Sequence, residues 1–114
     1  MADNIFLDII EGKIPCDKVY EDDEVFAFRD ISPAAPTHIL ILPKKPIPTL
    51  NDLTEVDAAL VGRLFLAAKK IASQEGLAER GYRTVFNCNA EAGQTVFQLH
   101  LHLLGGRPMA WPPG

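Results

Sequence analysis

Two stretches of the chain carry apolar side chains every three or four residues, the spacing that places them on one face of a helix. The first covers residues 5–10; Asp3 or Asn4 can cap it, and a glycine and a proline follow it. The second begins at Thr54, which forms a capping-box variant with the aspartate three residues later, and it ends near Gly76. The pattern therefore predicts one short and one long helix.

Five runs rich in β-branched, aromatic and leucine residues predict strands. In chain order they cover residues 18–21, 24–29, 38–43, 82–87 and 96–104. Asp22 and Asp23 separate the first two runs, which indicates a hairpin with a tight acidic turn. Because strands lie on both sides of a single long helix, we expect an α+β fold with a five-stranded, mostly antiparallel sheet.

The size and charge of the chain limit what it can bind. Its 114 residues, 47% of them hydrophobic and 23% charged, fit one domain spanning residues 1–114. The net charge is −4 and the basic residues are scattered, so we do not expect a nucleic acid as a partner. A small nucleotide stays compatible with this charge, because one phosphate needs only backbone N–H groups and a few side chains.

The cysteine content and the apolar runs indicate the compartment. Cys16 and Cys88 are too few for a disulfide scaffold, and acidic residues interrupt the first apolar stretch, unlike in a signal peptide. No apolar run approaches the roughly 20 residues that span a bilayer. We therefore expect a cytoplasmic protein with no membrane partner.

Two of the three histidines, His100 and His102, lie two residues apart in the last predicted strand, so their side chains share a face with Gln98. The leucines between them point toward the core. Three interpretations are open: polar residues on a solvated face, a zinc site completed by His38, or an imidazole that attacks an electrophilic phosphorus. The spacing alone does not choose among them.

The segment Gly93 to Gly114, with its Gln-Leu-His-Leu-His-Leu-Leu-Gly-Gly-Arg run and Trp-Pro-Pro-Gly end, resembles the active-site strand and tail of the histidine triad (HIT) superfamily. The tail is similar to that of the Hint branch, the histidine triad nucleotide-binding proteins. Asp30-Ile31-Ser32-Pro33 and Pro36-Thr37-His38 are also typical of the family. The resemblance implies a HIT-like fold and a dimeric nucleoside 5′-phosphoramidase. Such an enzyme cleaves the P–N bond of a purine nucleoside monophosphate linked to an amine, without a metal or cofactor.

The resemblance also implies roles for single residues. His100 matches the nucleophile that forms a nucleotidyl-histidine intermediate, His102 the histidine that contacts the phosphate, and His38 an upstream histidine of the pocket. The expected substrate-binding residues are Asp30 at the ribose, Ile31, Phe28 and Arg29 near the base, Asn87, Gly93 and Thr95 around the phosphate, and Trp111 at the partner subunit's pocket. Four of these also have a plain structural interpretation: Asp30 and Asn87 as turn residues, Thr95 as a strand residue and Trp111 as a packing anchor.

Gln98 departs from the family pattern, which has the first histidine of the triad at this position. In the family, the nucleophile's second ring nitrogen bonds to the main-chain carbonyl at this position, which any residue type supplies. Glutamine can donate and accept hydrogen bonds but cannot carry a positive charge or relay a proton through a ring. We therefore expect reduced phosphoramidase activity. The alternative is a nucleotide-binding regulatory or scaffold protein with weak or no catalysis.

Overall fold

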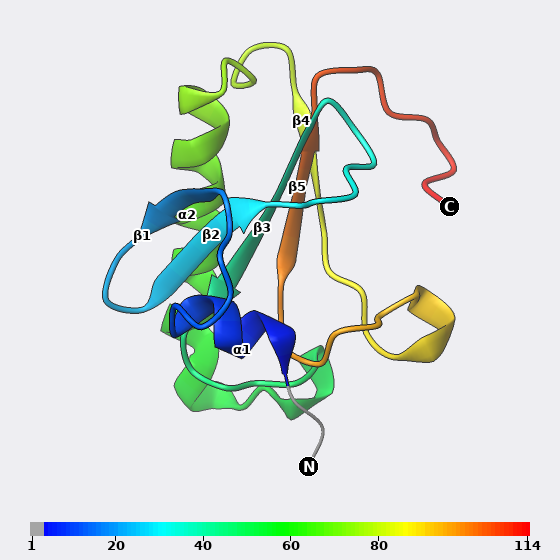
Figure 1. Ribbon diagram of the computed structural model, residues 1–114. Coiled ribbons are helices and arrows are strands. Elements are labelled where there is room, and N and C mark those ends of the chain that lie inside the picture. The colour runs from blue at the N-terminus through cyan, green and yellow to red at the C-terminus, as the bar shows by residue number, and fades with distance from the viewer. Residues whose placement is uncertain (1–3) are drawn as a thin grey trace.

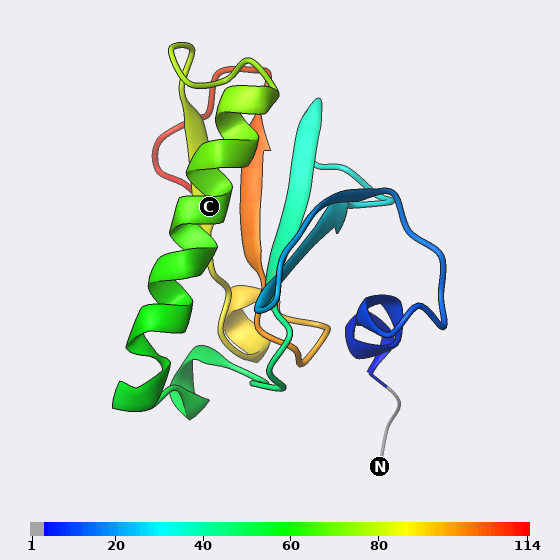
Figure 2. The same cartoon turned by 90° about the vertical axis from the view of Figure 1, so that its left-hand side faces the viewer.

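One antiparallel sheet of five strands, in the order β1-β2-β3-β5-β4, separates two helices in the computed structural model, which describes residues 4–114 (Figures 1 and 2). The elements are α1 (Ile5–Ile10), β1 (Lys18–Glu21), β2 (Val25–Arg29), β3 (Thr37–Pro43), α2 (Ala58–Gln74), β4 (Tyr82–Val85) and β5 (Leu101–Gly105), with 3-10 turns η1 (Leu50–Asp52), η2 (Glu55–Asp57) and η3 (Ala90–Ala92). The α+β prediction is confirmed. No helix among the described residues is long and apolar enough to cross a membrane.

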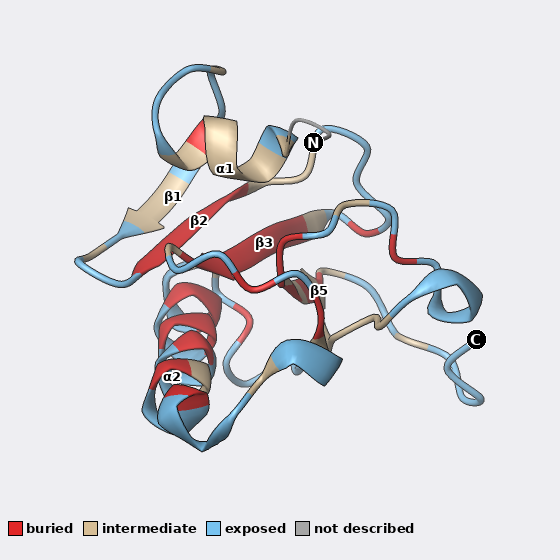
Figure 3. Ribbon diagram, turned by 90° about the horizontal axis from the view of Figure 1, so that it is seen from below, coloured by how far each residue is buried: buried red, intermediate tan, exposed pale blue. Residues whose placement is uncertain are grey.

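The central strand β3 and its neighbour β2 are buried along most of their length, as Figure 3 shows. Alternate side chains point to opposite sides of a strand, so one set packs beneath α2 and the other beneath α1. The α2 side holds Val25, Ala27, Ile39 and Ile41, and the α1 side holds Phe26, Phe28, Leu40 and Leu42. This double coverage explains why both strands are almost continuously apolar in the sequence.

The cap predicted for the first helix is present, whereas the capping box predicted at Thr54 caps the 3-10 turn η2 and not α2, which begins at Ala58. The Asn4 side-chain oxygen accepts hydrogen bonds from the backbone N–H groups of Phe6 and Leu7 at 3.1 and 3.3 Å, while Asp3 lies outside the described residues. The Thr54 N–H donates to the Asp57 carboxylate at 3.0 Å, which completes the predicted capping box. The 3-10 turn η2 follows Thr54 directly and leads into α2.

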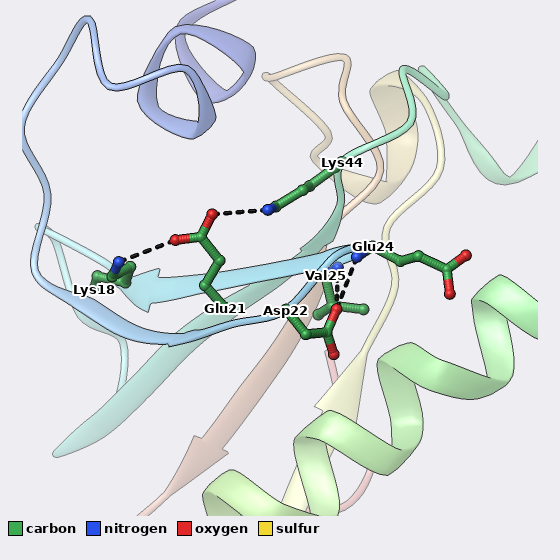
Figure 4. Close-up of polar contacts among 6 residues, drawn as sticks. All are labelled: Lys18, Glu21, Asp22, Glu24, Val25 and Lys44. Atoms are coloured by element: carbon green, nitrogen blue, oxygen red, sulfur yellow. Dashed lines mark hydrogen bonds and ion pairs between the residues drawn. The ribbon is translucent and has the colours of Figure 1, made fainter.

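The predicted hairpin joins β1 and β2, and its turn is held by one aspartate (Figure 4). The Asp22 carboxylate accepts from the N–H groups of Glu24 and Val25, each at 2.8 Å. On β1, Glu21 forms ion pairs with Lys18 at 3.0 Å and Lys44 at 2.7 Å, and Lys44 follows β3 directly. The ion pair between Glu21 and Lys44 attaches the edge strand β1 to the segment that follows β3.

Two predicted strands are shorter than expected. β4 ends at Val85, and β5 begins at Leu101 where the sequence pattern predicts residue 96. The residues before β5 run beside the segment that follows β3, where the Leu99 N–H donates to the Ile47 carbonyl at 2.7 Å. The segment after β3 is not a strand. The regular hydrogen bonding between strands therefore begins only at Leu101, where β5 pairs with β3.

Candidate functional site

The three histidines meet on the face of the sheet that α1 covers, and we call them the histidine cluster. His38 lies near the start of β3 and His102 lies on the adjacent strand β5, directly opposite Leu40. The His38 Nε2 and His102 Nδ1 atoms are 2.9 Å apart. The ring centroid of His100 lies 5.0 Å from that of His102. The structure thus brings together residues 38, 100 and 102, which the sequence singles out separately.

The orientation of the His100 ring is set by a main-chain carbonyl. His100 Nδ1 lies 2.6 Å from the carbonyl oxygen of Gln98. A carbonyl can only accept, so Nδ1 carries the proton and Nε2 keeps its lone pair in the neutral ring. The Phe6 ring of α1 packs edge-on against the imidazole at 5.0 Å. His100 is therefore held in the tautomer that a nucleophile needs.

The protons of His38 and His102 follow from the same reasoning. The Ala34 N–H donates to His38 Nδ1 at 2.9 Å, so the neutral His38 ring carries its proton on Nε2. That proton faces His102 Nδ1, which leaves the His102 proton on Nε2. His102 Nε2 lies 3.5 Å from Asn87 Nδ2; because both atoms carry protons in this tautomer, the two groups are neighbours without a hydrogen bond between them. The Ala34 backbone N–H thus determines the direction of the hydrogen bond between the two rings, in which His38 Nε2 donates and His102 Nδ1 accepts.

All three imidazoles are shifted toward the neutral form. Burial lowers the pKa of His38, and the nearby Asp30 carboxylate opposes this only in part. Burial also lowers the pKa of His100, against the opposing effect of the Gln98 carbonyl. Burial, followed by the charges that His100 and His38 would carry, lowers the pKa of His102 to about 4. At neutral pH the cluster is uncharged, and the His100 lone pair is available.

These depressed pKa values predict that the fold loses stability in mild acid. An unfolded chain, with histidine pKa values near 6.5, binds more protons than the folded chain once the pH falls below that value. The free energy of unfolding should therefore fall as the pH drops from about 6.5 toward 4, by up to about 1.4 kcal/mol for each unit of depression. Urea unfolding at pH 7 and pH 5 measures this. Equal stability at the two pH values would contradict the assignment.

Asp30 follows β2 and faces the cluster. One carboxylate oxygen accepts from the Ser32 N–H at 2.8 Å, as in a turn, and the other lies 3.6 Å from His38 Nε2. The neighbouring Ile31 is 96% exposed, whereas Phe28 is buried beneath α1 with its ring 5.5 Å from that of Phe6. The turn interpretation of Asp30 and its position beside the histidine cluster are thus compatible.

Arg29 is not part of the cluster, although the resemblance groups it with Phe28 near a base. Consecutive strand residues point to opposite faces, so Arg29 faces α2. Its guanidinium makes a two-pronged ion pair with the Glu75 carboxylate, with N···O distances of 3.0 and 2.9 Å. Arg29 therefore connects β2 to the C-terminal end of α2.

The remaining predicted substrate residues occupy the surface. Gly93 and Thr95 are exposed in the loop between β4 and β5, on either side of the buried Gln94. Trp111 is 80% exposed on the C-terminal tail, with the Arg83 guanidinium 5.8 Å from its ring. Among the predicted phosphate residues, Asn87 lies beside a histidine, with its Nδ2 atom 3.5 Å from His102 Nε2.

Gln98 corrects the predicted polar row. The sequence pattern places it on the same strand face as His100 and His102, but it precedes β5 and is 1% exposed. Its side chain bonds to backbone groups of residues 43, 45 and 47. The predicted core positions of the intervening leucines, Leu99, Leu101 and Leu103, are confirmed.

Two contributors to the site have no sequence signal. Phe6 belongs to the apolar face of α1, and nothing in its local pattern indicates a contact with a histidine 94 residues later. Ala34 acts through its backbone N–H, which every residue except proline offers. Only the folded chain shows either role.

A geometry that could hold a metal ion exists beside His100. Asp30, His38 and His102 each offer one ligand atom, and these atoms lie within 4.8 Å of one another. This set differs from the one that the sequence suggests, because Asp30 takes the place of His100. Oxygen and imidazole nitrogen ligands suit divalent transition metals, and coordination through His38 Nε2 would require that atom to lose its proton.

Known proteins resemble this chain along nearly its whole length. Residues 11–109 match the HIT domain family. The purine nucleoside phosphoramidase of Escherichia coli is 55% identical over 107 residues, which are 94% of this chain and 90% of that protein. An uncharacterized HIT-like protein of Synechococcus elongatus is 58% identical over 112 residues, 98% of this chain and 97% of the relative.

Solved structures agree with these matches. A HIT family hydrolase from Legionella pneumophila superimposes with a TM-score of 0.97 at 54% identity, covering 98% of this chain and all of that one. A histidine triad nucleotide-binding protein from Candida albicans gives a TM-score of 0.82 at 30% identity, covering 95% and 85% of the two chains. The expected HIT-like fold is confirmed, and the chain belongs to the HIT family.

Proposed function

We propose that this chain hydrolyses purine nucleoside 5′-phosphoramidates through a nucleotidyl intermediate on His100. The observation that carries the proposal is the 2.6 Å contact between His100 Nδ1 and the Gln98 carbonyl, which leaves Nε2 free to attack. The 55% identity to the E. coli purine nucleoside phosphoramidase supports the choice of substrate class. No metal or cofactor takes part in the proposed reaction.

The proposed reaction has two steps. The His100 Nε2 lone pair forms a bond to phosphorus while the P–N bond breaks, and the leaving nitrogen takes a proton from solvent and departs as an amine. The Gln98 carbonyl stabilises the positive charge that the modified imidazole then carries. Water attacks the same phosphorus, returns the proton to solvent and releases the nucleoside monophosphate, so His100 recovers its lone pair.

Other residues bind the substrate in this proposal. The His102 Nε2 proton, with Asn87 beside it, donates to a phosphate oxygen. Asp30 accepts from the ribose hydroxyls, while Ile31 and Phe28 contact the base. Gly93 and Thr95 approach the phosphate from the loop before β5, and Trp111 reaches the pocket of a partner subunit. Arg29 supports the base only indirectly, because its guanidinium is engaged by Glu75.

The proposal is tested by amine release from adenosine 5′-phosphoramidate at neutral pH with a chelator present. Turnover under these conditions would support a metal-independent phosphoramidase. Binding of AMP without turnover would favour the alternative, a nucleotide-binding regulatory or scaffold protein. The preserved carbonyl contact of His100 favours the enzyme, even though Gln98 stands where we infer that the family has its first triad histidine.

The sheet edge at β4 supports a homodimer. Within residues 4–114, β4 pairs only with β5, so its outer edge is open to another strand. Leu66 of α2 is 65% exposed and lines the same surface hollow as Tyr82 of β4. An open edge beside exposed apolar side chains suits a second copy of this chain, and the pair would carry two nucleotide pockets.

The variant Leu66→Glu should convert such a dimer into a monomer, because two buried like charges would face each other across the interface. Sedimentation velocity at micromolar concentration measures the change in mass. Val56→Glu is the matched control, since Val56 is equally apolar and 82% exposed but lies on η2. A monomeric wild-type chain would overturn the dimer and leave the reaction at His100 untouched.

A further inference from the structure

We propose that Gln98 is a positioning residue whose side-chain amide fixes the carbonyl that orients His100. This inference rests on the proposed reaction at His100. In this inference the glutamine has a role of its own in the site, beyond the absence of a histidine at this position.

The Gln98 amide uses all of its hydrogen-bonding groups on the backbone. Its Nε2 group donates to the carbonyls of Pro43 and Lys45, both at 2.9 Å. Its Oε1 atom accepts from the Ile47 N–H at 3.1 Å. The two N–H donors and the oxygen acceptor of the side chain are thus all paired with backbone groups. Gln98 is 1% exposed.

These bonds connect the nucleophile to the central sheet. Pro43 is the last residue of β3, and the segment from Pro43 to Ile47 continues directly from that strand. The next residue after Gln98 adds a backbone bond, from the Leu99 N–H to the Ile47 carbonyl at 2.7 Å. The Gln98 carbonyl, which accepts from His100 Nδ1, therefore sits on a segment anchored by four hydrogen bonds to the continuation of β3.

A histidine cannot reproduce this anchor in the present chain. A neutral imidazole offers one donor and one acceptor, so at least one of the three backbone groups would lose its partner. Two of the three belong to the buried residues Pro43 and Ile47. A protonated imidazole offers two donors and no acceptor. The Ile47 N–H, which is itself a donor, would then have no acceptor at this position. An unpaired buried backbone group is costly, so the surrounding segment would shift to find a partner.

The position of the Gln98 carbonyl has a measurable effect at His100. A carbonyl that accepts from Nδ1–H favours the protonated ring, and it opposes the burial that lowers the His100 pKa. The Asp30 charge, from the turn after β2, also raises the His100 pKa, and a charge on His38 of β3 would lower it. The His102 ring lies 5.0 Å away on β5. Loosening the carbonyl contact, with those groups unchanged, should lower the His100 pKa further.

The test compares Gln98→Met with Gln94→Met. Gln94 is the matched control because it is also buried and also bonds three backbone groups, the Asn89 N–H and the carbonyls of Pro48 and Val96. Both variants remove an amide while keeping the side-chain length. Nitrogen-15 NMR titration of the His100 ring reports its pKa and tautomer, and steady-state kinetics on adenosine 5′-phosphoramidate report kcat and KM.

We expect Gln98→Met to lower the His100 pKa and to reduce kcat about tenfold or more, with KM changed less than about threefold. Gln94→Met should leave the His100 pKa at its wild-type value. The milder variant Gln98→His, which keeps one donor and one acceptor, should still have a kcat below wild type. It provides the same comparison if the methionine variant does not fold.

Two results would overturn the inference: an unchanged His100 pKa in Gln98→Met, or a kcat of Gln98→His above that of wild type. The NMR titration needs no substrate. A wild-type chain without turnover would refute the phosphoramidase proposal, while a lowered His100 pKa in Gln98→Met would still support the positioning role of the amide.

Discussion

Replacing His100 by alanine should abolish phosphoramidate turnover and the covalent nucleotide adduct together. The expected loss in kcat is at least about 1,000-fold, because water would have to attack phosphorus and displace the amine in one step, without a covalent intermediate. Rapid quenching of the wild-type reaction followed by mass spectrometry should detect one nucleotidyl group on His100. The alanine variant should show none.

The control for His100→Ala is the binding of AMP, measured by calorimetry. The His38–His102 contact does not involve His100, so this pair should persist and nucleotide affinity should stay within about tenfold of wild type. Melting temperatures verify that the variant is folded. Residual turnover near the wild-type rate, or an adduct on another residue, would refute the nucleophile assignment.

Replacing His102 by alanine should lower kcat by about 100- to 1,000-fold, the loss expected when a donor to a developing phosphoryl charge is removed. The variant also leaves His38 Nε2 without its acceptor at 2.9 Å. Because the proposed nucleophile remains, the nucleotidyl adduct on His100 should still form, but slowly. Single-turnover kinetics separate this outcome from that of His100→Ala.

The same variant tests the pKa of His102. A group whose pKa is depressed in the fold costs stability in acid, so its removal should flatten the fall in stability between pH 7 and pH 5. Urea unfolding of wild type and His102→Ala at both pH values measures the difference. If the free energy of unfolding fell equally steeply in both chains, the pH dependence would belong to groups other than His102. An unaltered kcat in His102→Ala would show that His102 takes no part in the reaction.

Local patterns in the sequence predicted most of the elements correctly. The Asn4 cap, the Thr54–Asp57 capping box and the acidic hairpin turn at Asp22 each depend on residues within three positions of one another. Such contacts are encoded by neighbouring residues and are therefore visible in the sequence. The apolar stripe of α2 and the buried runs of β2 and β3 were predicted for the same reason.

The errors concern partners distant in sequence. The alternation from residue 96 onward is typical of a strand, but the partner of Leu99 is a segment about 50 residues earlier that has already left the sheet. The same segment takes up the Gln98 side chain, which removes it from the polar row. Arg29 stays a predicted residue near the base, but the sequence did not indicate its ion-pair partner Glu75, which lies 46 residues away.

The neutrality of the histidine cluster has a consequence for how an anionic ligand arrives. A cluster of uncharged imidazoles next to the Asp30 carboxylate, in a chain of net charge −4, exerts no long-range attraction on a nucleotide. Hydrogen bonds at contact distance must then provide the affinity, and few counterions are released on binding. Raising the ionic strength would screen a weak repulsion, so the association should be nearly insensitive to salt, unlike that of phosphate sites built from lysine and arginine.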